Sequence, residues 1–193
     1  MKKDILELIK KTGSIRHFKK TRISDRLVDT ILEAGVWGPS IFGIQPWHFV
    51  VVKNPLLIKK IASIVDRNSH KTIGGVRKLL QMCSAVIKNC KLLIAVCVNG
   101  SAKKTASRYG VLYKKKAAIA ELLASGAAIQ NMFLTLTSLG LGGVWLDAPT
   151  IFPYEINNIL DEKDNIVSLL AIGYPNQSVR RSIRNYNTLV KFI

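Results

Sequence analysis

Runs of apolar residues alternate with segments of helical periodicity along this chain. Three runs, at 47–52, 90–98 and 165–175, are apolar at nearly every position and rich in β-branched residues. Such runs predict strands that are covered on both faces, and the run at 47–52 is predicted to be central in its sheet. A shorter run, GGVWLDAP at 142–149, predicts a strand followed by a turn.

The segments around these runs carry the spacing and end signals of helices. Ser24 is a favourable N-cap for a helix that ends at the following glycines, and Asn54-Pro55 opens a helix that extends to about residue 65. The order of helices and strands indicates an α/β or α+β protein in which helices cover one central sheet. The other predicted helices are a short amphipathic one at the N-terminus, 76–89, a long apolar one at 113–139, and one from Thr150 or Pro153 to Leu160.

The length of 193 residues and the absence of a linker predict one domain over 1–193. Its last part, 180–193, is predicted to be a basic, β-like arm, and the basic segment 101–110 is predicted to be a loop. The three cysteines lie seven residues apart without a metal-binding spacing, which indicates free thiols in a reducing compartment. Together with a charged N-terminus that lacks the apolar core of a secretory signal, this predicts a cytoplasmic protein.

An uncharged run from Leu122 to Leu146 is long enough to span a bilayer, and lysines 114–116 precede it. Polar residues within it and a glycine cluster near its end favour a buried helix followed by a strand. Membrane association remains an alternative, but no membrane partner is predicted.

Charge is placed unevenly along the chain. The net charge is +17, and residues 67–120 contribute 12 basic and no acidic side chains. Such a stretch can attract polyanions or steer acidic ligands. Because no nucleic-acid-binding motif accompanies it, we predict a basic soluble surface and no nucleic-acid partner. A non-enzymatic polyanion-binding protein is the alternative.

The residue pattern excludes several kinds of catalytic site. No Ser/His/Asp order, G-x-S-x-G turn, G-x-G-x-x-G motif or P-loop stands out, and the histidines at 17, 48 and 70 lack the spacing of metal ligands. We therefore predict neither a side-chain nucleophile nor a metal site. His48 lies in a predicted strand and is expected to be a packed or hydrogen-bonded side chain.

Two arginine-containing segments and one loop remain as candidate binding elements. TGSIRHF at 12–18 and RRSIRNY at 180–186 supply guanidinium groups, which suit phosphate oxygens. Ser14 and Arg16 are two apart on extended chain and would face one side. The loop at 38–46 carries polar side chains directly before a strand, where ligand contacts are common.

Taken in order, four segments resemble the FMN-dependent nitroreductases. SIRHF looks like the family's opening RRSIRxF, and GPSIFGIQPWHFVVV resembles its APSxxNxQPWxFVVV. ASGAAIQNMFLTLTSLGLGGVW is similar to the family's long central helix and the strand after it. VSLLAIGYP, with the arginines that follow, resembles its last strand and phosphate-binding tail. The resemblance covers nearly the whole chain.

The resemblance implies an α+β fold with a central, mostly antiparallel sheet covered by helices, in an intertwined homodimer whose two FMN molecules each touch both subunits. The C-terminal arm would add a strand to the other subunit's sheet. The implied FMN contacts fall into four groups: an N-terminal pair near the phosphate and flavin edge, a loop beside the ring, a segment whose backbone approaches flavin N5, and C-terminal arginines on the phosphate. In that order they are Ser14, Arg16, Pro39, Ser40, Gly43, Leu146, Asp147, Arg181 and Arg184.

The implied activity passes hydride from NADH or NADPH, through flavin N5, to a nitroaromatic, quinone or similar small-molecule acceptor. The flavin supplies the chemistry, which agrees with the absence of a catalytic triad. Three departures motivate an alternative in which the same flavin serves dehalogenation, dehydrogenation or flavin degradation. Thr12 and Gly13 stand where the family has two arginines, and Gly43 stands where it has an asparagine.

Overall fold

The computed structural model of the protein describes residues 5–179 and 184–193. Its centre is a sheet of β1 (Trp47–Val52), β2 (Leu92–Val98), β3 (Gly142–Leu146) and β4 (Asn165–Gly173), in the order β1-β2-β4-β3. Every neighbouring pair in this sheet is antiparallel. The predicted α+β fold with an antiparallel sheet is therefore confirmed.

The position predicted for β1 is wrong. β1 lies at one edge of the four-stranded sheet, and the two central strands are β2 and β4. β1 is apolar because helices cover both of its faces. Whether a strand is central depends instead on having a neighbouring strand on each side, and β1 has only one. β2, which is buried at all seven positions, has both helical cover and two neighbours.

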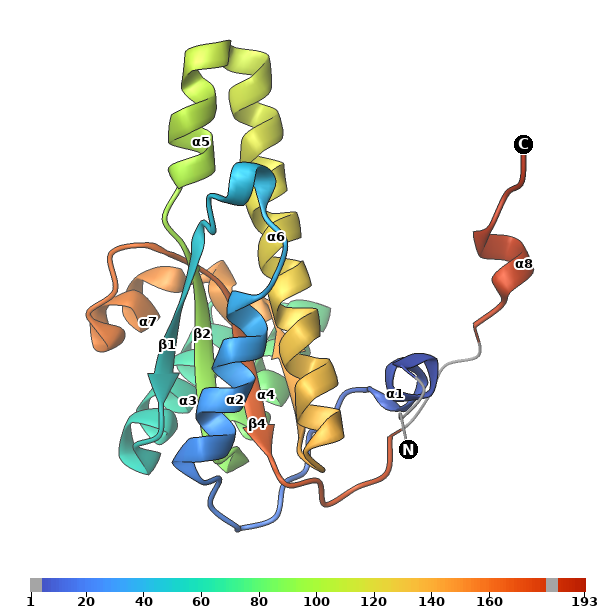
Figure 1. The fold of residues 1–193 in the computed structure, drawn as a ribbon. Coiled ribbons are helices and arrows are strands. Elements are labelled where there is room, and N and C mark those ends of the chain that lie inside the picture. Colours follow the sequence, from blue (N-terminus) through green and yellow to red (C-terminus); the bar gives the residue numbers. More distant parts are fainter. Residues whose placement is uncertain (1–4, 180–183) are drawn as a thin grey trace.

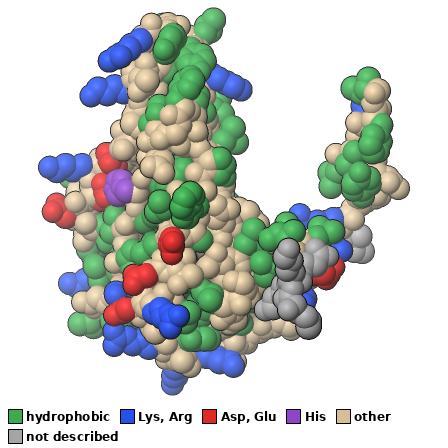
Figure 2. Space-filling model, viewed as in Figure 1, with side chains coloured by type: hydrophobic (Ala, Val, Ile, Leu, Met, Phe, Trp, Pro, Cys, Tyr) green, Lys and Arg blue, Asp and Glu red, His purple; other side chains and the backbone are tan. Residues whose placement is uncertain are grey.

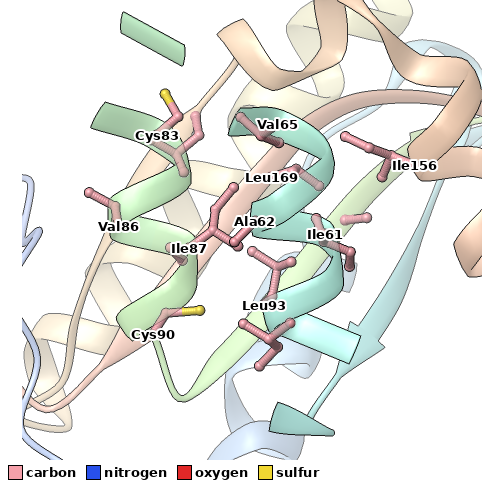
Figure 3. Close-up of a cluster of buried hydrophobic side chains, with 14 of the residues drawn as sticks. Ile61, Ala62, Val65, Cys83, Val86, Ile87, Cys90, Leu93, Ile156 and Leu169 are labelled. Carbon is pink, nitrogen blue, oxygen red and sulfur yellow. The ribbon is translucent and has the colours of Figure 1, made fainter. Parts of the chain in front are cut away.

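Helices form a layer on each face of the sheet (Figure 1). On one face, α2 (Asp25–Val36) and the 28-residue α6 (Val111–Ser138) pack against the sheet through a shared apolar core. On the other face lie α3 (Pro55–Ser69), α4 (Gly74–Asn89) and α7 (Pro153–Leu160). Figure 3 shows apolar side chains of α3, α4, α7, β2 and β4 meeting in this second core: Ile61, Ala62, Val65, Cys83, Val86, Ile87, Cys90, Leu93, Ile156 and Leu169.

The cysteines are three buried free thiols, as predicted. Burial raises the pKa of Cys83 to about 11 and the pKa of Cys90 to about 12. At neutral pH Cys83 and Cys90 are protonated and act as small apolar residues of the core.

The loop predicted at 101–110 is wrong, because α5 (Ser101–Ala106) and a 3-10 turn (Ser107–Tyr109) form there. The buried carboxylate of Glu121, on α6, accepts hydrogen bonds from the backbone N–H groups of Ala102 (2.7 Å) and Lys103 (3.1 Å). A helix of this length needs partners for its first N–H groups. Sequence reading missed this helix because its capping residue lies on another element.

Both ends of the chain carry short helices. α1 spans Ile5–Lys11, and α8 spans Tyr186–Leu189 near the C-terminus. The β-like tail predicted over 180–193 is therefore wrong for the four residues of α8, where the Asn185 side chain accepts a hydrogen bond from the backbone N–H of Asn187 at 3.1 Å. The arm extends away from the sheet and its helices in Figure 1.

By length and composition, α6 could cross a membrane, but 44% of its most apolar 18-residue stretch is buried inside the protein. Its buried side chains include Ile129, Met132 and Leu136, which pack against α2 and the sheet. This part of α6 therefore serves as the core helix that the sequence predicted. Its other apolar side chains, including Ile119, Leu122 and Leu123, are exposed.

Candidate functional site

The segment that contains Ser14 and Arg16 runs along the outer edge of β3. Ser14 forms a parallel bridge with Gly143, and the backbone N–H of Ile15 donates to the Gly143 carbonyl at 2.8 Å. The Gln177 side-chain oxygen accepts from the N–H groups of Arg16 (3.0 Å) and of the next residue. The buried Ile15 and these bonds fix the backbone, while Ser14 stays exposed and Arg16 half-buried.

Two glycines of β3 allow this close approach. A Cβ atom on Gly142 would lie 2.6 Å from a side-chain carbon of Ile15, and one on Gly143 would lie 2.9 Å from the backbone oxygen of Ala171. Neither separation occurs between unstrained atoms. Gly142 is thus required for the close approach of the Ser14 segment, and Gly143 for the close packing of β3 against β4. A cavity of about 230 Å³ opens beside it, with Gly13, Ile15 and Gln177 in its lining.

At the other end of β3, Leu146 is buried and Asp147 is exposed. A hydrogen-bonded chain fixes the Asp147 carboxylate: Trp145 Nε1 donates to Ser168 Oγ at 2.6 Å, and Ser168 Oγ donates to Asp147 Oδ1 at 2.9 Å. The Asp147 carbonyl accepts from the N–H (2.9 Å) and hydroxyl (2.7 Å) of Thr150. Both the side chain and the backbone of Asp147 are therefore held in place.

Replacing Ser168 by alanine is expected to destabilise the protein by about 1–2 kcal/mol and to release the Asp147 side chain. Ser168 is 2% exposed, and its loss leaves the indole N–H of Trp145 without its partner. Urea unfolding would give the stability change, and a change in tryptophan emission relative to the wild type would report the altered environment of the Trp145 indole. Ser138→Ala is the matched control, because that exposed hydroxyl bonds only a carbonyl of its own helix; an equal loss in both variants would contradict the expectation.

Ser14 and Asp147 lie at the two ends of one strand edge. Gly143 and Leu146, the last residue of β3, are three positions apart, which is about 10 Å at the rise of a β-strand, and Asp147 follows directly. The structure thus brings Ser14, Arg16, Leu146 and Asp147 to one edge.

The backbone of β3 contributes to this edge because β3 ends the sheet. In an antiparallel pair, the N–H and C=O groups of alternate residues point away from the neighbouring strand. Gly143 is such a residue, since its carbonyl bonds Ile15 on the outer side. The same alternation places the backbone groups of Trp145 on the outer side, where a planar ligand could bond them. Asp147 follows the end of β3, and its carbonyl is already bonded to Thr150.

The predicted loop residues do not join this group within one chain. The loop leads into β1, which lies three strand spacings, or about 14 Å, from β3 across the sheet. Ser40 Oγ accepts from the Gln45 N–H at 3.0 Å, while Phe42, Gly43 and Gln45 adopt positive φ angles. Gly38, which would meet α6 if it carried a Cβ, seats the loop on that helix. Pro39, Ser40 and Gly43 therefore form a second, separate group.

Gly43 stands where the family pattern has an asparagine, and the space around it shows whether that side chain would fit. Gly43 has φ +66° and no atom within 4 Å of a Cβ built on it. An asparagine tolerates this conformation better than most residues. The fold would therefore accept the amide that the sequence lacks.

Of the two C-terminal arginines predicted to bind phosphate, Arg184 is exposed and lies two residues before α8, which stands away from the sheet in Figure 1. Arg181 lies outside the described residues. On the face that Figure 2 shows, Lys and Arg side chains lie at several separate places.

Sequence reasoning missed Gln177 and Ser168, which fix the two ends of the β3 edge. Ser168 is one polar residue within an otherwise apolar strand, NIVSLLAIG, and this could have drawn attention to it. Gln177 follows the last strand and gives no such signal. Its role depends on residues about 160 positions earlier.

Comparison with known proteins agrees with this architecture. Residues 9–174 match the family model described as the Nitroreductase family. A protein of Methanothermobacter thermautotrophicus, provisionally named NADH dehydrogenase/NAD(P)H nitroreductase, is 29% identical over 181 residues, which cover 90% of this chain and 78% of that one. An iodotyrosine deiodinase of Hydra vulgaris is 28% identical over 189 residues, with 86% and 62% covered.

Among solved structures, a provisionally named nitroreductase of Desulfovibrio desulfuricans in complex with FMN superposes with a TM-score of 0.75. It is 24% identical, and the match covers 98% of this chain and 96% of that chain. At this identity the likeness shows the fold.

Proposed function

Because the chain belongs to the Nitroreductase family, we propose that it is an FMN-dependent oxidoreductase that passes hydride from NADH or NADPH to a nitroaromatic, quinone or similar acceptor. The observation that carries this proposal is the open edge of β3, with Ser14 and Arg16 at one end and the fixed Asp147 segment at the other. The names of the archaeal relative and the FMN-bound structure support it.

The residues at this edge fit the two ends of FMN. Ser14 can donate a hydrogen bond to a phosphate oxygen, and the Arg16 guanidinium can add charge-assisted bonds. The outward backbone groups of Trp145 can bond the polar edge of a flat ring. Bound FMN would supply hydride acceptance and hydride donation, and the protein would hold and orient it.

Asp147 is expected to affect the reduction potential of a ring bound beside it. The Ser168 bond keeps the carboxylate near the end of β3, and a fixed negative charge disfavours addition of electrons nearby. Thr150 bonds the Asp147 carbonyl, so the turn after β3 is already in place before a ligand binds. Preorganisation of this kind reduces the free-energy cost of binding.

The proposal includes an intertwined homodimer that completes each site. One chain separates the β3 edge from the Pro39–Ser40–Gly43 loop, so a second copy is needed to place both groups on one flavin. Exposed apolar side chains on α6, including Ile119, Leu122 and Leu123, offer a surface for that copy; Figure 2 shows apolar side chains along this part of the molecule. We take 1–193 as one domain, with 180–193 as an arm that brings Arg181 and Arg184 to the phosphate.

Anaerobic absorbance spectroscopy tests the function. The protein reconstituted with FMN should be yellow, and NADH or NADPH should bleach the flavin band, which a nitroaromatic or quinone then restores. Free FMN with the same nicotinamide is the control. Protein that takes up no FMN, or bound flavin that neither nicotinamide reduces, would contradict the proposal.

A second candidate keeps the flavin but reduces a halogenated aromatic. The Hydra vulgaris deiodinase is similar along 86% of this chain, and Gly43 leaves open the place where the family carries an amide. Release of iodide from iodotyrosine by the dithionite-reduced flavoprotein would support this reaction. If nitroaromatics but not iodotyrosine reoxidise the flavin, the first function stands alone.

A further inference from the structure

Three potential metal ligands converge on the side of the sheet that faces α3, α4 and α7. His48 on β1 and Cys97 on β2 are directly paired across the two strands. Glu162 joins them from the turn between α7 and β4, with His48 Nε2 2.8 Å from Glu162 Oε2. One ligand atom from each of the three residues lies within 4.8 Å of the other two.

The surrounding structure holds these groups in place. Cys97 is fully buried, and the side chains of Glu162 and His48 are 12% and 39% exposed. Glu162 Oε1 accepts from the backbone N–H of Asp164 at 2.8 Å. The Asn157 amide donates to the carbonyls of Glu162 (3.2 Å) and Asp164 (2.8 Å), which closes the turn. Hydrogen bonds therefore hold the cluster in place, and it is accessible to solvent on the His48 side.

The ligand set selects one kind of metal ion. Imidazole nitrogen, thiolate sulfur and carboxylate oxygen together suit Zn²⁺, whereas Mg²⁺ and Ca²⁺ prefer oxygen alone. Around a tetrahedral zinc ion the ligand atoms lie about 3–4 Å from one another, from the usual Zn–N, Zn–O and Zn–S distances. Small side-chain movements would bring the present atoms to that spacing.

Asp164 supplies the support that a metal-binding histidine usually has. Its Oδ2 lies 3.6 Å from His48 Nδ1, on the opposite side of the ring from Glu162. This separation is longer than a hydrogen bond, and a small side-chain rotation that shortened it to about 3 Å would fix the tautomer that leaves Nε2 free to bind a metal ion. The two acidic side chains therefore have different positions, one beside the metal-binding nitrogen and one behind the ring.

We propose that His48 Nε2, Cys97 Sγ and the Glu162 carboxylate bind Zn²⁺, with water in the fourth position. The ion replaces the thiol proton of Cys97, which passes to solvent, and no electron transfer is involved. The site is separate from the β3 edge, because β1 and β3 are opposite edges of the sheet. A bound ion would link β1, β2 and the Glu162 turn. Its ligand His48 lies three residues after Gln45 of the 38–46 loop.

Cobalt substitution tests this proposal in the full-length chain. After dialysis against a chelator, added Co²⁺ should give a thiolate-to-cobalt charge-transfer band in the difference spectrum, and stoichiometric Zn²⁺ should remove it. Cys97→Ser should lose the band, whereas Cys90→Ser, which removes another buried thiol, should keep it. A cobalt spectrum without a thiolate band would overturn the proposal, and this outcome needs no variant to fold.

Variants of His48 and of Asp164, which lies behind the His48 ring, extend the test. His48→Ala should abolish tight Zn²⁺ binding in competition with a chromogenic chelator, whereas His70→Ala, at an exposed helix end, should not. Asp164→Asn should weaken binding about 10-fold, as expected for a residue that orients a ligand. Zn²⁺ should raise the melting temperature of the wild type but not of His48→Ala. Unchanged Zn²⁺ affinity in both His48→Ala and Cys97→Ser would show that the cluster is only a hydrogen-bonded group.

Discussion

Gly143→Ala is expected to destabilise the protein by about 2–3 kcal/mol and to displace the Ser14 segment. The new Cβ would lie 2.9 Å from the Ala171 backbone oxygen, with side-chain carbons of Ile172 and Leu136 at 3.3 Å. Because the closest atom belongs to the neighbouring strand, a side-chain rotation cannot relieve the contact. The strand itself must move, and the Gly143 carbonyl that bonds Ile15 moves with it.

Thermal unfolding measures this change, and a decrease of about 5–10 °C in Tm is expected for a chain of this size. Gly75→Ala makes the same exchange in α4, where no atom lies within 4 Å of the added Cβ. A helical alanine there should leave the stability unchanged or slightly raised. If Gly143→Ala melts at the wild-type temperature, β3 does not depend on glycine at this position.

Arg16→Gln is expected to weaken FMN binding roughly 10- to 100-fold, the loss that corresponds to one charged hydrogen-bonding group. Within residues 5–179 and 184–193, no hydrogen bond or ion pair occupies the Arg16 guanidinium, while its backbone is fixed by Gln177. A positioned backbone with an uncommitted cation is what an anionic ligand requires. The exchange should leave the unfolding free energy nearly unchanged, because the Gln177 bond uses only the backbone.

Flavin fluorescence titration measures the affinity of each variant. Arg26→Gln is the matched control, because this exposed arginine has the same charge and lies on α2, outside the proposed site. It should bind FMN like the wild type. An Arg16→Gln variant with wild-type FMN affinity would remove Arg16 from the proposed site without contradicting the family assignment.

The sequence predicted those helices and strands whose formation depends on local residue patterns. The continuous apolar runs identified all four strands, and Asn54 capped its helix through bonds to the N–H groups of Leu56 (2.9 Å) and Leu57 (3.4 Å). The family resemblance followed from four short motifs in the right order, and the family match confirms it. These features depend on neighbouring residues, so the sequence contains them directly.

Tertiary structure decided every feature that joins distant residues. α5 forms where a loop was predicted, because Glu121 binds its first N–H groups from another helix. β1 is an edge strand, since strand order depends on pairing and not on the polarity of one segment.

The candidate site divides in the same way. Motifs pointed to Ser14, Arg16 and Asp147, but only the sheet order separated them from Ser40 and its loop. The Ser168 bond and the Gln177 bonds join residues that the sequence does not pair.

The proposed metal site shows this limit most clearly. Its ligands lie 49 and 65 positions apart along the chain, a spacing that matches no local metal-binding motif. Strand pairing places His48 opposite Cys97, and the Glu162 turn completes the cluster. The sequence by itself determined which elements form and which family they belong to. The packing of those elements decided which side chains meet, because contacts across a sheet are set by register and strand order.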